Sequence, residues 1–376
     1  MNFKFFVVTL LLSFSFYTLA EADSQLLDIS IDSKITKQSL SFKLSLPNGY
    51  ENAPDKFYPV FITTAGGSRI ESLTSQVKWL SHVDFAPIPQ VILLTIPDIK
   101  YANKDKFTSA AGQESATLAQ VLRDEVLPHI DNTYRTSGYR IIEGFSSFGH
   151  FPLYMLRHHS DVINAFFIFS PALGLDKSGL VASLDDNWQL SSKRHHYLYL
   201  SLGTFLENRQ HFEQAKASLN KLAKTPRTQF EFADLSKDNY LSGPTIGLIK
   251  ASQSTFADLQ PDYTIFHDEG EVALTRYFKK LNEKYGEEID LKNKLVDLSF
   301  SYANSDKFDQ AIALMKSVVA EDPTDTLLYI RLAQVQIKAK RNGEAKLSLN
   351  NAYKLASASD NEEAQSYIKR MQADLN

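Results

Sequence analysis

The sequence of 376 residues contains no cysteine. This absence excludes disulfide bonds, thiol catalysis, and zinc or iron–sulfur sites built on cysteine ligands. A side chain that acts as a nucleophile must therefore do so through oxygen or nitrogen. The composition is otherwise that of a folded globular protein, with 43% hydrophobic and 22% charged residues, and the length suits two domains.

An excess of charge of one sign is also absent. The 40 basic and 44 acidic side chains give a formal net charge of −4, and no long run of one sign occurs. Binding to a phosphate backbone or an anionic bilayer requires clustered positive charge. We therefore expect no nucleic-acid partner.

One uncharged apolar run stands at the N-terminus. Lys4 precedes the apolar residues 5–20, and residues 20–22 (Ala-Glu-Ala) form the small-x-small pattern of a signal-peptidase site. This pattern predicts a signal peptide at residues 1–22 and a secreted or periplasmic protein. A membrane anchor is the alternative, but the run is shorter than the roughly 20 residues of a spanning helix, so we expect no stable span.

From about residue 26 to residue 235, short apolar runs alternate with longer amphipathic segments, which is typical of an α/β fold. Several of the expected strands are continuously hydrophobic, as strands covered on both faces must be. We predict helices at 113–134 and 147–159, and an antiparallel edge hairpin formed by 26–31 and 40–46. The other strands are predicted at 58–64, 90–96, 139–143, 165–170, 196–202 and 229–235.

Residues 287–376 contain helical patterns and no predicted strands. Residues 307–311 (Lys-Phe-Asp-Gln-Ala) are matched 34 residues later by 341–345 (Arg-Asn-Gly-Glu-Ala), which is the tetratricopeptide period. An amphipathic helical tail without true repeats is the alternative. Because about three repeats normally form a continuous core, two would lean on the first domain or on a protein partner. We therefore predict domains at 23–286 and 287–376.

The segment most informative for chemistry is residues 139–151, where a predicted buried strand enters a helix through Gly-Phe-Ser. In an α/β hydrolase such a sharp turn carries the nucleophilic serine above the sheet, next to a helix N-terminus. This context favours Ser146 as the nucleophile. The bend also favours small residues two positions to either side, a condition that Gly144 meets and Phe148 does not.

Two other interpretations of this turn are open. Ser147 could be the nucleophile, with Gly149 correctly placed after it, or both serines could simply cap the helix. If Ser146 is the nucleophile, the backbone N–H of Ser147 would contribute to an oxyanion hole. A second N–H would come from the loop after the strand at 58–64, from Ala65 or Gly66.

The remaining members of a serine triad are less clearly marked. Glu207 follows the predicted strand at 196–202 and is the candidate acid, although a solvated carboxylate at a helix start is equally consistent with its position. Weaker acid candidates are Asp176, Asp185 and Asp186. A histidine should follow the last strand, but the loop at 236–242 contains none.

From about residue 58 to residue 286, the sequence resembles the Putative esterase family of α/β hydrolases, which includes esterase D and the enterobactin and siderophore esterases. The resemblance is carried by the turn at Ser146 and by residues 125–131 (Glu-Val-Leu-Pro-His-Ile-Asp), 132–135 (Asn-Thr-Tyr-Arg) and 164–171. It implies an α/β-hydrolase fold, Ser146 as nucleophile, Glu207 as acid and no cofactor. The segment at 281–286, before the helical repeats, resembles a bacterial subgroup.

Two departures from the family pattern bear on activity. Phe148 stands where the family has glycine, and Tyr240 stands where the family has the general-base histidine. A phenol with a reference pKa near 10 is a poor substitute for an imidazole near 6.5. His150, near the turn, or His267 could stand in as the base, but we favour other roles for the histidines of the chain: a local cap for His267, a helix end for His158 and His159, and a strand start for His195 and His196. We expect no metal site.

The sequence leads to two hypotheses of different classes. In the first, the protein is an exported serine esterase that hydrolyses a small carboxylic or siderophore-type ester through Ser146. In the second, it is a catalytically silent hydrolase fold that serves as a binding or scaffold module, with the helical tail docking a protein. Family resemblance favours the first, whereas Phe148 and Tyr240 favour the second.

Overall fold

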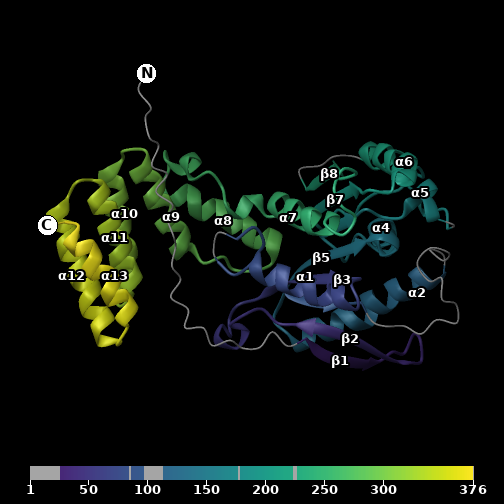
Figure 1. Ribbon diagram of the computed structural model, residues 1–376, viewed down its shortest axis with the longest axis horizontal. Coiled ribbons are helices and arrows are strands. Elements are labelled where there is room, and N and C mark those ends of the chain that lie inside the picture. The colour runs from purple at the N-terminus through teal and green to yellow at the C-terminus, as the bar shows by residue number, and fades with distance from the viewer. Residues whose placement is uncertain (1–25, 84–85, 97–112, 177, 223–226, 376) are drawn as a thin grey trace, which may run out of the picture. The chain divides into compact units, whose positions relative to one another are not determined.

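The computed structural model describes residues 26–83, 86–96, 113–176, 178–222 and 227–375 (Figure 1). The predicted signal peptide lies outside these residues. The chain forms two compact units, of which the first ends at Ala257 and the second begins at Asp258. Among the described residues, no helix combines the length and apolar character needed to cross a membrane.

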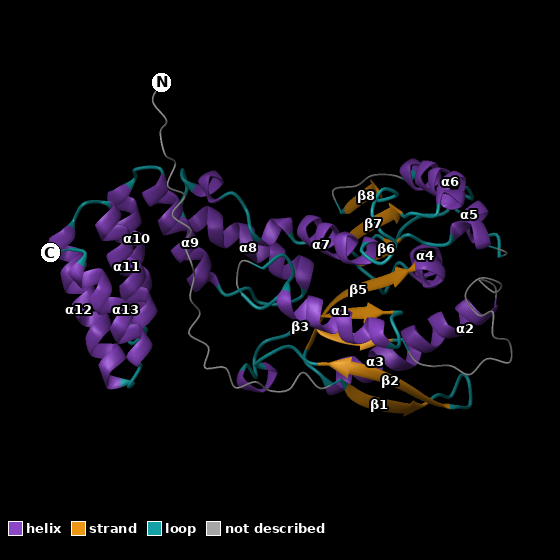
Figure 2. Ribbon diagram, in the orientation of Figure 1, coloured by secondary structure: helices purple, strands orange, loops and turns teal. Residues whose placement is uncertain are grey.

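The first unit is built on one eight-stranded sheet with the order β1-β2-β4-β3-β5-β6-β7-β8 (Figure 2). β1 and β2 form an antiparallel hairpin at one edge, β2 pairs antiparallel with β4, and all other pairs are parallel. The predicted α/β fold with its edge hairpin is confirmed. The strands are β1 (Leu27–Asp32), β2 (Ser39–Ser45), β3 (Tyr58–Thr63), β4 (Ile92–Thr95), β5 (Thr136–Phe145), β6 (Ala165–Phe169), β7 (His196–Leu202) and β8 (Thr228–Asp234).

Helices cover both faces of this sheet, which explains why every residue of β3, β4, β6 and β7 is buried. On one face of the sheet, an aliphatic core is formed with the helices α2, α3, α4, α5 and α6. α2 continues through a π turn, Leu122–Val126, into α3. The helices of this unit are α1 (Ser68–Trp79), α2 (Gln113–Val121), α3 (Leu127–Thr133), α4 (His150–His158), α5 (Leu180–Ser183), α6 (Arg209–Lys221) and α7 (Gly243–Thr255).

The opposite face of the sheet is aromatic. The ring of Phe167 packs against those of Phe61 and Tyr197 with centroid distances of 6.0 and 6.1 Å, and Phe169 packs against Tyr199 at 6.0 Å. α7 lies against β6 and β7 on this face, where Gly247 approaches the ring of Phe169. Because side chains alternate between the two faces along each strand, the sheet has an aliphatic core on one face and an aromatic core on the other.

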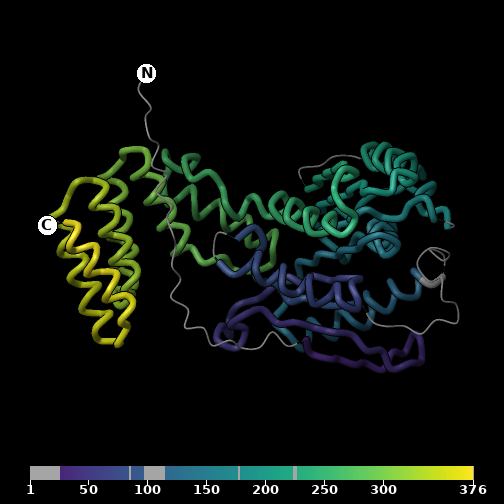
Figure 3. Tube along the Cα trace, viewed as in Figure 1, coloured from purple at the N-terminus to yellow at the C-terminus, as the bar shows by residue number. Residues whose placement is uncertain are grey.

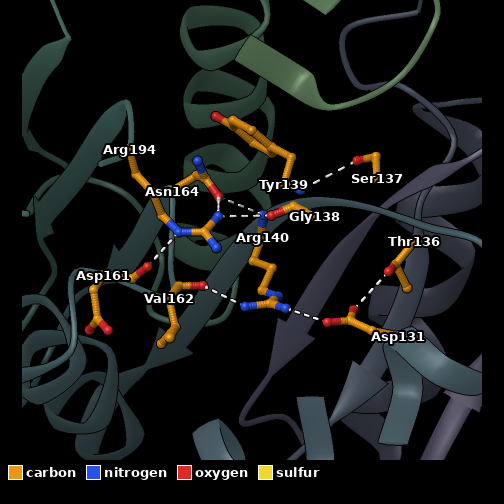
Figure 4. A network of polar contacts seen from close by, with 10 residues as sticks. All are labelled: Asp131, Thr136, Ser137, Gly138, Tyr139, Arg140, Asp161, Val162, Asn164 and Arg194. Atoms are coloured by element: carbon orange, nitrogen blue, oxygen red, sulfur yellow. Dashed lines mark hydrogen bonds and ion pairs between the residues drawn. The ribbon is translucent and has the colours of Figure 1, made fainter. Parts of the chain in front are cut away.

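A polar network fastens the amino ends of the central strands (Figure 4). Asn164 Oδ1 accepts hydrogen bonds from the backbone N–H of Arg140 at 3.0 Å and from Nη1 of Arg194 at 2.9 Å. The same nitrogen of Arg194 donates to Gly138 O at 2.9 Å, and Arg140 forms an ion pair with Asp131. This network lies at the end of the sheet opposite to the carboxyl ends of the strands.

The second unit consists of antiparallel helices (Figure 3). Successive repeats are joined by hydrogen bonds between residues about 34 positions apart. Tyr263 donates to Asp297, Lys338 to Asn304 and Gln334 to Tyr367, and His267 pairs with Ser301. The predicted repeat period is therefore a structural period. The helices are α8 (Glu271–Tyr285), α9 (Leu291–Asn304), α10 (Phe308–Glu321), α11 (Thr326–Lys338), α12 (Asn342–Ala358) and α13 (Glu362–Ala373).

α8 lies in this second unit, although the sequence pattern placed it with the first domain. A short 3₁₀ turn, Tyr263–Phe266, contacts α9 and precedes α8, so the two form an additional repeat with a shortened first helix. Phe278 and Tyr285 of α8 are fully buried. This extra repeat supplies apolar surface that two repeats alone would lack.

Candidate functional site

The turn after β5 has the geometry of a nucleophile elbow. Ser146 directly follows β5 and adopts φ = +58°, in the left-handed region that non-glycine residues rarely occupy. Such a conformation costs about 1–3 kcal/mol and persists only where surrounding structure enforces it. Ser146 is partly exposed, and it begins a 3₁₀ turn, Ser146–Gly149, that leads into α4. The predicted serine therefore stands at a sharp bend between strand and helix.

Two glycines allow this bend. A Cβ on Gly144 would lie 2.5 Å from Phe148 O, and a Cβ on Gly149 would lie 2.8 Å from Pro171 Cβ. Both distances are too short for any other residue without a shift of backbone or ring. Phe148, which departs from the family pattern, fits because its side chain points outward and is 39% exposed. The close approach expected two residues after Ser146 is instead made at Gly149.

The glycine loop after β3 is the candidate second half of an oxyanion hole. Ala65 is buried, and its N–H donates to Thr63 Oγ1 at 2.8 Å. Gly66 is exposed, and within the described residues its N–H has no protein acceptor. Of the two loop residues predicted as donors, Gly66 is thus the one whose N–H is open to a ligand. Ser147, the other predicted donor, lies in the first turn after the elbow.

Tyr240 lies beside the elbow in an aromatic cluster. Its ring packs between those of Phe145 and Phe205, with centroid distances of 4.8 and 4.9 Å. Phe145 directly precedes Ser146, so Tyr240 contacts the residue that comes before the candidate nucleophile. In the described part of the chain, no hydrogen bond joins the hydroxyls of Tyr240 and Ser146.

Glu207, the predicted acid, is exposed and lies in the 3₁₀ turn Leu206–Asn208 after β7. Within the described residues its carboxylate has no hydrogen bond or ion pair. The adjacent Asn208 is buried instead, and its Oδ1 accepts the N–H of Gly174 at 2.8 Å. Asn208 therefore fixes the loop after β6 to the loop after β7, while Glu207 faces solvent.

The weaker acid candidates all have local partners. Asp176 accepts hydrogen bonds from Ser178 and from the N–H of Val181. Burial raises the pKa of Asp176, but these hydrogen bonds together lower it by more, so its pKa lies below the ordinary value. Asp185 pairs with Lys221 at 2.8 Å and Asp186 with Arg157 at 3.5 Å. None of these contacts involves Ser146.

The histidines also engage groups other than Ser146. The buried His150 places Nε2 3.0 Å from Ala172 O, and His196 places Nε2 2.7 Å from Ser160 O. His267 lies in the second unit, 2.9 Å from Ser301 Oγ. Burial lowers the pKa values of both His158 and His159 at the end of α4. The described residues contain no cluster of three or more potential metal ligands.

One polar group at the site was not singled out from the sequence. Glu143 is fully buried in β5, three residues before Ser146, and forms a bidentate ion pair with Arg69. Thr63 Oγ1 donates to the same carboxylate. The sequence did contain a sign of this group, since Glu143 is a charged residue inside an apolar strand. Such a residue is rarely buried without a partner.

Comparison with known families gives two matches on separate parts of the chain. Residues 33–228 match a family described as Putative esterase, and residues 303–365 match a tetratricopeptide repeat. The first match covers half of the chain, and the second lies within the repeat unit. No curated protein sequence matches significantly.

Similar solved structures share the fold at low sequence identity. An uncharacterised protein from Capnocytophaga ochracea matches with a TM-score of 0.61 at 15% identity, over 93% of this chain and 99% of that one. An IroE-like serine hydrolase from Shewanella oneidensis matches with a TM-score of 0.59 at 15% identity, over 79% and 99% of the respective chains. Both similarities establish the architecture alone.

Proposed function

Because the chain belongs to the Putative esterase family of hydrolases, we propose that it hydrolyses carboxylic esters with Ser146 as the nucleophile. The observation that carries this proposal is the backbone of Ser146, which keeps a positive φ of 58° at the end of β5. A serine that only capped a helix would not need this strained conformation.

The elbow supports a two-step acyl transfer. Ser146 Oγ attacks the ester carbonyl carbon, and the carbonyl oxygen becomes an oxyanion that accepts hydrogen bonds from the N–H groups of Ser147 and Gly66. Collapse of this intermediate releases the alcohol and leaves an acyl-serine, which water then hydrolyses. The proposed proton acceptor is the phenolate form of Tyr240, which takes the proton from Ser146 Oγ and passes it to the departing alkoxide. A phenol is almost entirely protonated at neutral pH, so this form is scarce. We therefore expect slow turnover.

The proposed substrate is a small carboxylic or siderophore-type ester outside the cytoplasm. Support for the ester class comes from the family, and support for an apolar substituent comes from the rings of Phe145, Phe205 and Tyr240 beside the elbow. Support for export comes from the apolar N-terminal segment. Glu207 keeps the proposed role of acid, for which a movement of its loop toward the elbow is required.

A second candidate function is a catalytically silent binding or scaffold module. The packing of Tyr240 between two phenylalanine rings favours it, because an aromatic residue held in this way closes the position where a general base would act. In this case the tetratricopeptide-like helices would dock a protein partner.

Hydrolysis of a short-chain aryl ester by four proteins separates the two functions. The proteins are the wild type, Ser146→Ala, Tyr240→His and, as a matched control, Ser147→Ala. The esterase proposal expects turnover by the wild type and Ser147→Ala, and loss of turnover in Ser146→Ala. If only Tyr240→His gains activity that depends on Ser146, the wild type is silent and the second function holds. Equal rates in all four proteins would contradict both.

A further inference from the structure

Glu143 is a buried carboxylate for which the reaction as described has no use. Its side chain is inaccessible to solvent, yet both oxygens are satisfied, since Arg69 Nη1 donates to Oε1 at 3.0 Å and Nη2 donates to Oε2 at 2.8 Å. Oε1 also accepts the hydroxyl of Thr63. A carboxylate kept out of water needs such complete pairing, and losing either partner leaves an uncompensated buried charge.

The two partners of Glu143 flank the glycine loop in the sequence. Thr63 is the last residue of β3, and Arg69 lies in the first turn of α1. Residues 64–67 connect these two elements and include Gly66, whose N–H is the proposed oxyanion donor. The residues at both ends of the loop thus bind one carboxylate on β5, the strand that directly precedes Ser146.

The hydroxyl of Thr63 transmits this constraint to the loop backbone. It donates to Glu143 and at the same time accepts the N–H of Ala65 at 2.8 Å. A hydrogen bond to a charged acceptor polarises the hydroxyl and strengthens the bond that it accepts. Because the Ala65 peptide is fixed in this way, the orientation of the following peptide, with the N–H of Gly66, is restricted as well.

We propose that Glu143 is a positioning residue that sets the 65–67 loop against the Ser146 turn through Thr63 and Arg69. It does not touch the substrate. Arg69 neutralises the carboxylate, so that Glu143 can anchor the loop without opposing a developing oxyanion nearby. The catalytic part of this inference rests on the proposed function, whereas the restraint on the loop is a property of the protein itself.

Amide hydrogen exchange tests the restraint independently of turnover. In Thr63→Val, which keeps the side-chain shape but removes the hydroxyl, we expect exchange of the Ala65 amide, the hydrogen-bonded amide of this loop, to accelerate at least about tenfold. Thr63→Ser, which keeps the hydroxyl, should restore most of the protection. Glu143→Gln provides a second variant if Thr63→Val does not fold. Unchanged exchange in both variants would overturn the proposal.

Kinetics on the same proteins tests the catalytic consequence. Since loss of one oxyanion donor costs about 10²–10³ in kcat, displacement of the loop should lower kcat by about 10- to 100-fold with little change in KM. The affinity for an arylboronic acid, which mimics the oxyanion, should fall by the same factor. Thr74→Val, which removes another buried hydroxyl of the same unit, should leave kcat unchanged.

The two readouts distinguish failure of this inference from failure of the proposed function. If Ser146→Ala keeps the wild-type rate, the esterase proposal fails, and hydrogen exchange still decides whether Glu143 restrains the loop. If Ser146 is required but Thr63→Val and Glu143→Gln keep full kcat and boronate affinity, the positioning role is wrong.

Discussion

At position 146 a serine occupies a backbone conformation that suits glycine, and its neighbours make this possible. Gly144 and Gly149 allow backbone and proline to approach closely, and Phe148 turns its ring toward solvent. A bulky residue at 148 is therefore compatible with the elbow, although the family pattern and the spacing favour a small residue there. The departure that bears on catalysis is Tyr240, because it changes the group that can accept a proton.

His196 makes a pH-dependent contribution to stability that can be measured. Burial lowers its pKa, Arg194 adds to that shift, and the hydrogen bond to Ser160 O opposes it. Because the folded state favours the neutral ring, stability should be complete above the ordinary histidine pKa of about 6.5 and should fall as the pH drops below it. Urea unfolding at pH 7.5 and at pH 5.5 measures this effect. The free energy of unfolding should fall less between these two pH values in His196→Gln than in the wild type. Equal losses would contradict this assignment.

At the scale of elements, the strands could be predicted because parallel strands covered on both faces are continuously apolar. The predicted bounds of β7 agree with the structure, and those of β3 and β6 differ by one residue. The elbow could be predicted because a strand and a helix meet at Gly-x-Ser within a few residues. Glu143 could not be assigned a role, since its partners Arg69 and Thr63 are 74 and 80 residues away in the sequence.

The packing of α7 on the aromatic face depends on a single glycine. A Cβ on Gly247 would lie 2.5 Å from Cδ1 of Phe169, whose ring is fully buried, so the backbone or the ring would have to shift. Gly247→Ala should therefore destabilise the first unit by about 1–3 kcal/mol, despite the better helix propensity of alanine.

Gly343→Ala is the matched control, because this glycine of α12 has no neighbour within 4 Å of its would-be Cβ. We expect it to be neutral or to stabilise the second unit by less than about 1 kcal/mol. Denaturant unfolding of both variants measures the difference. A stabilising effect of Gly247→Ala would show that Phe169 yields to the added methyl group.

At the scale of the whole molecule, the chain combines a hydrolase sheet with a helical repeat unit that begins earlier than the sequence suggests. Asp258, the first residue of the second unit, binds Lys284 Nζ and the hydroxyl of Tyr285 on α8, each at 2.6 Å. The repeat motif around 307 and 341 was recognisable from its spacing. The first repeat was not, because its leading helix is reduced to a 3₁₀ turn.

Truncation tests where the repeat unit begins. A fragment of residues 258–376 should fold as a helical domain, whereas a fragment of residues 287–376 loses α8 with the fully buried Phe278 and Tyr285. Since removal of one buried aromatic side chain costs about 3–5 kcal/mol, the shorter fragment should be less stable by about 3 kcal/mol or more. Thermal unfolding followed by circular dichroism compares them, and equal midpoints would place α8 outside the cooperative unit.

Covalent labelling tests the central claim, that Ser146 is presented as a nucleophile, most directly. The folded protein is treated with a fluorophosphonate, digested, and mapped by mass spectrometry, with Ser146→Ala as the control. We predict one phosphonyl adduct on Ser146, absent from the control and from protein unfolded before treatment. An adduct on Ser147, or the same labelling in Ser146→Ala, would contradict the account, as would the absence of any adduct on the wild type.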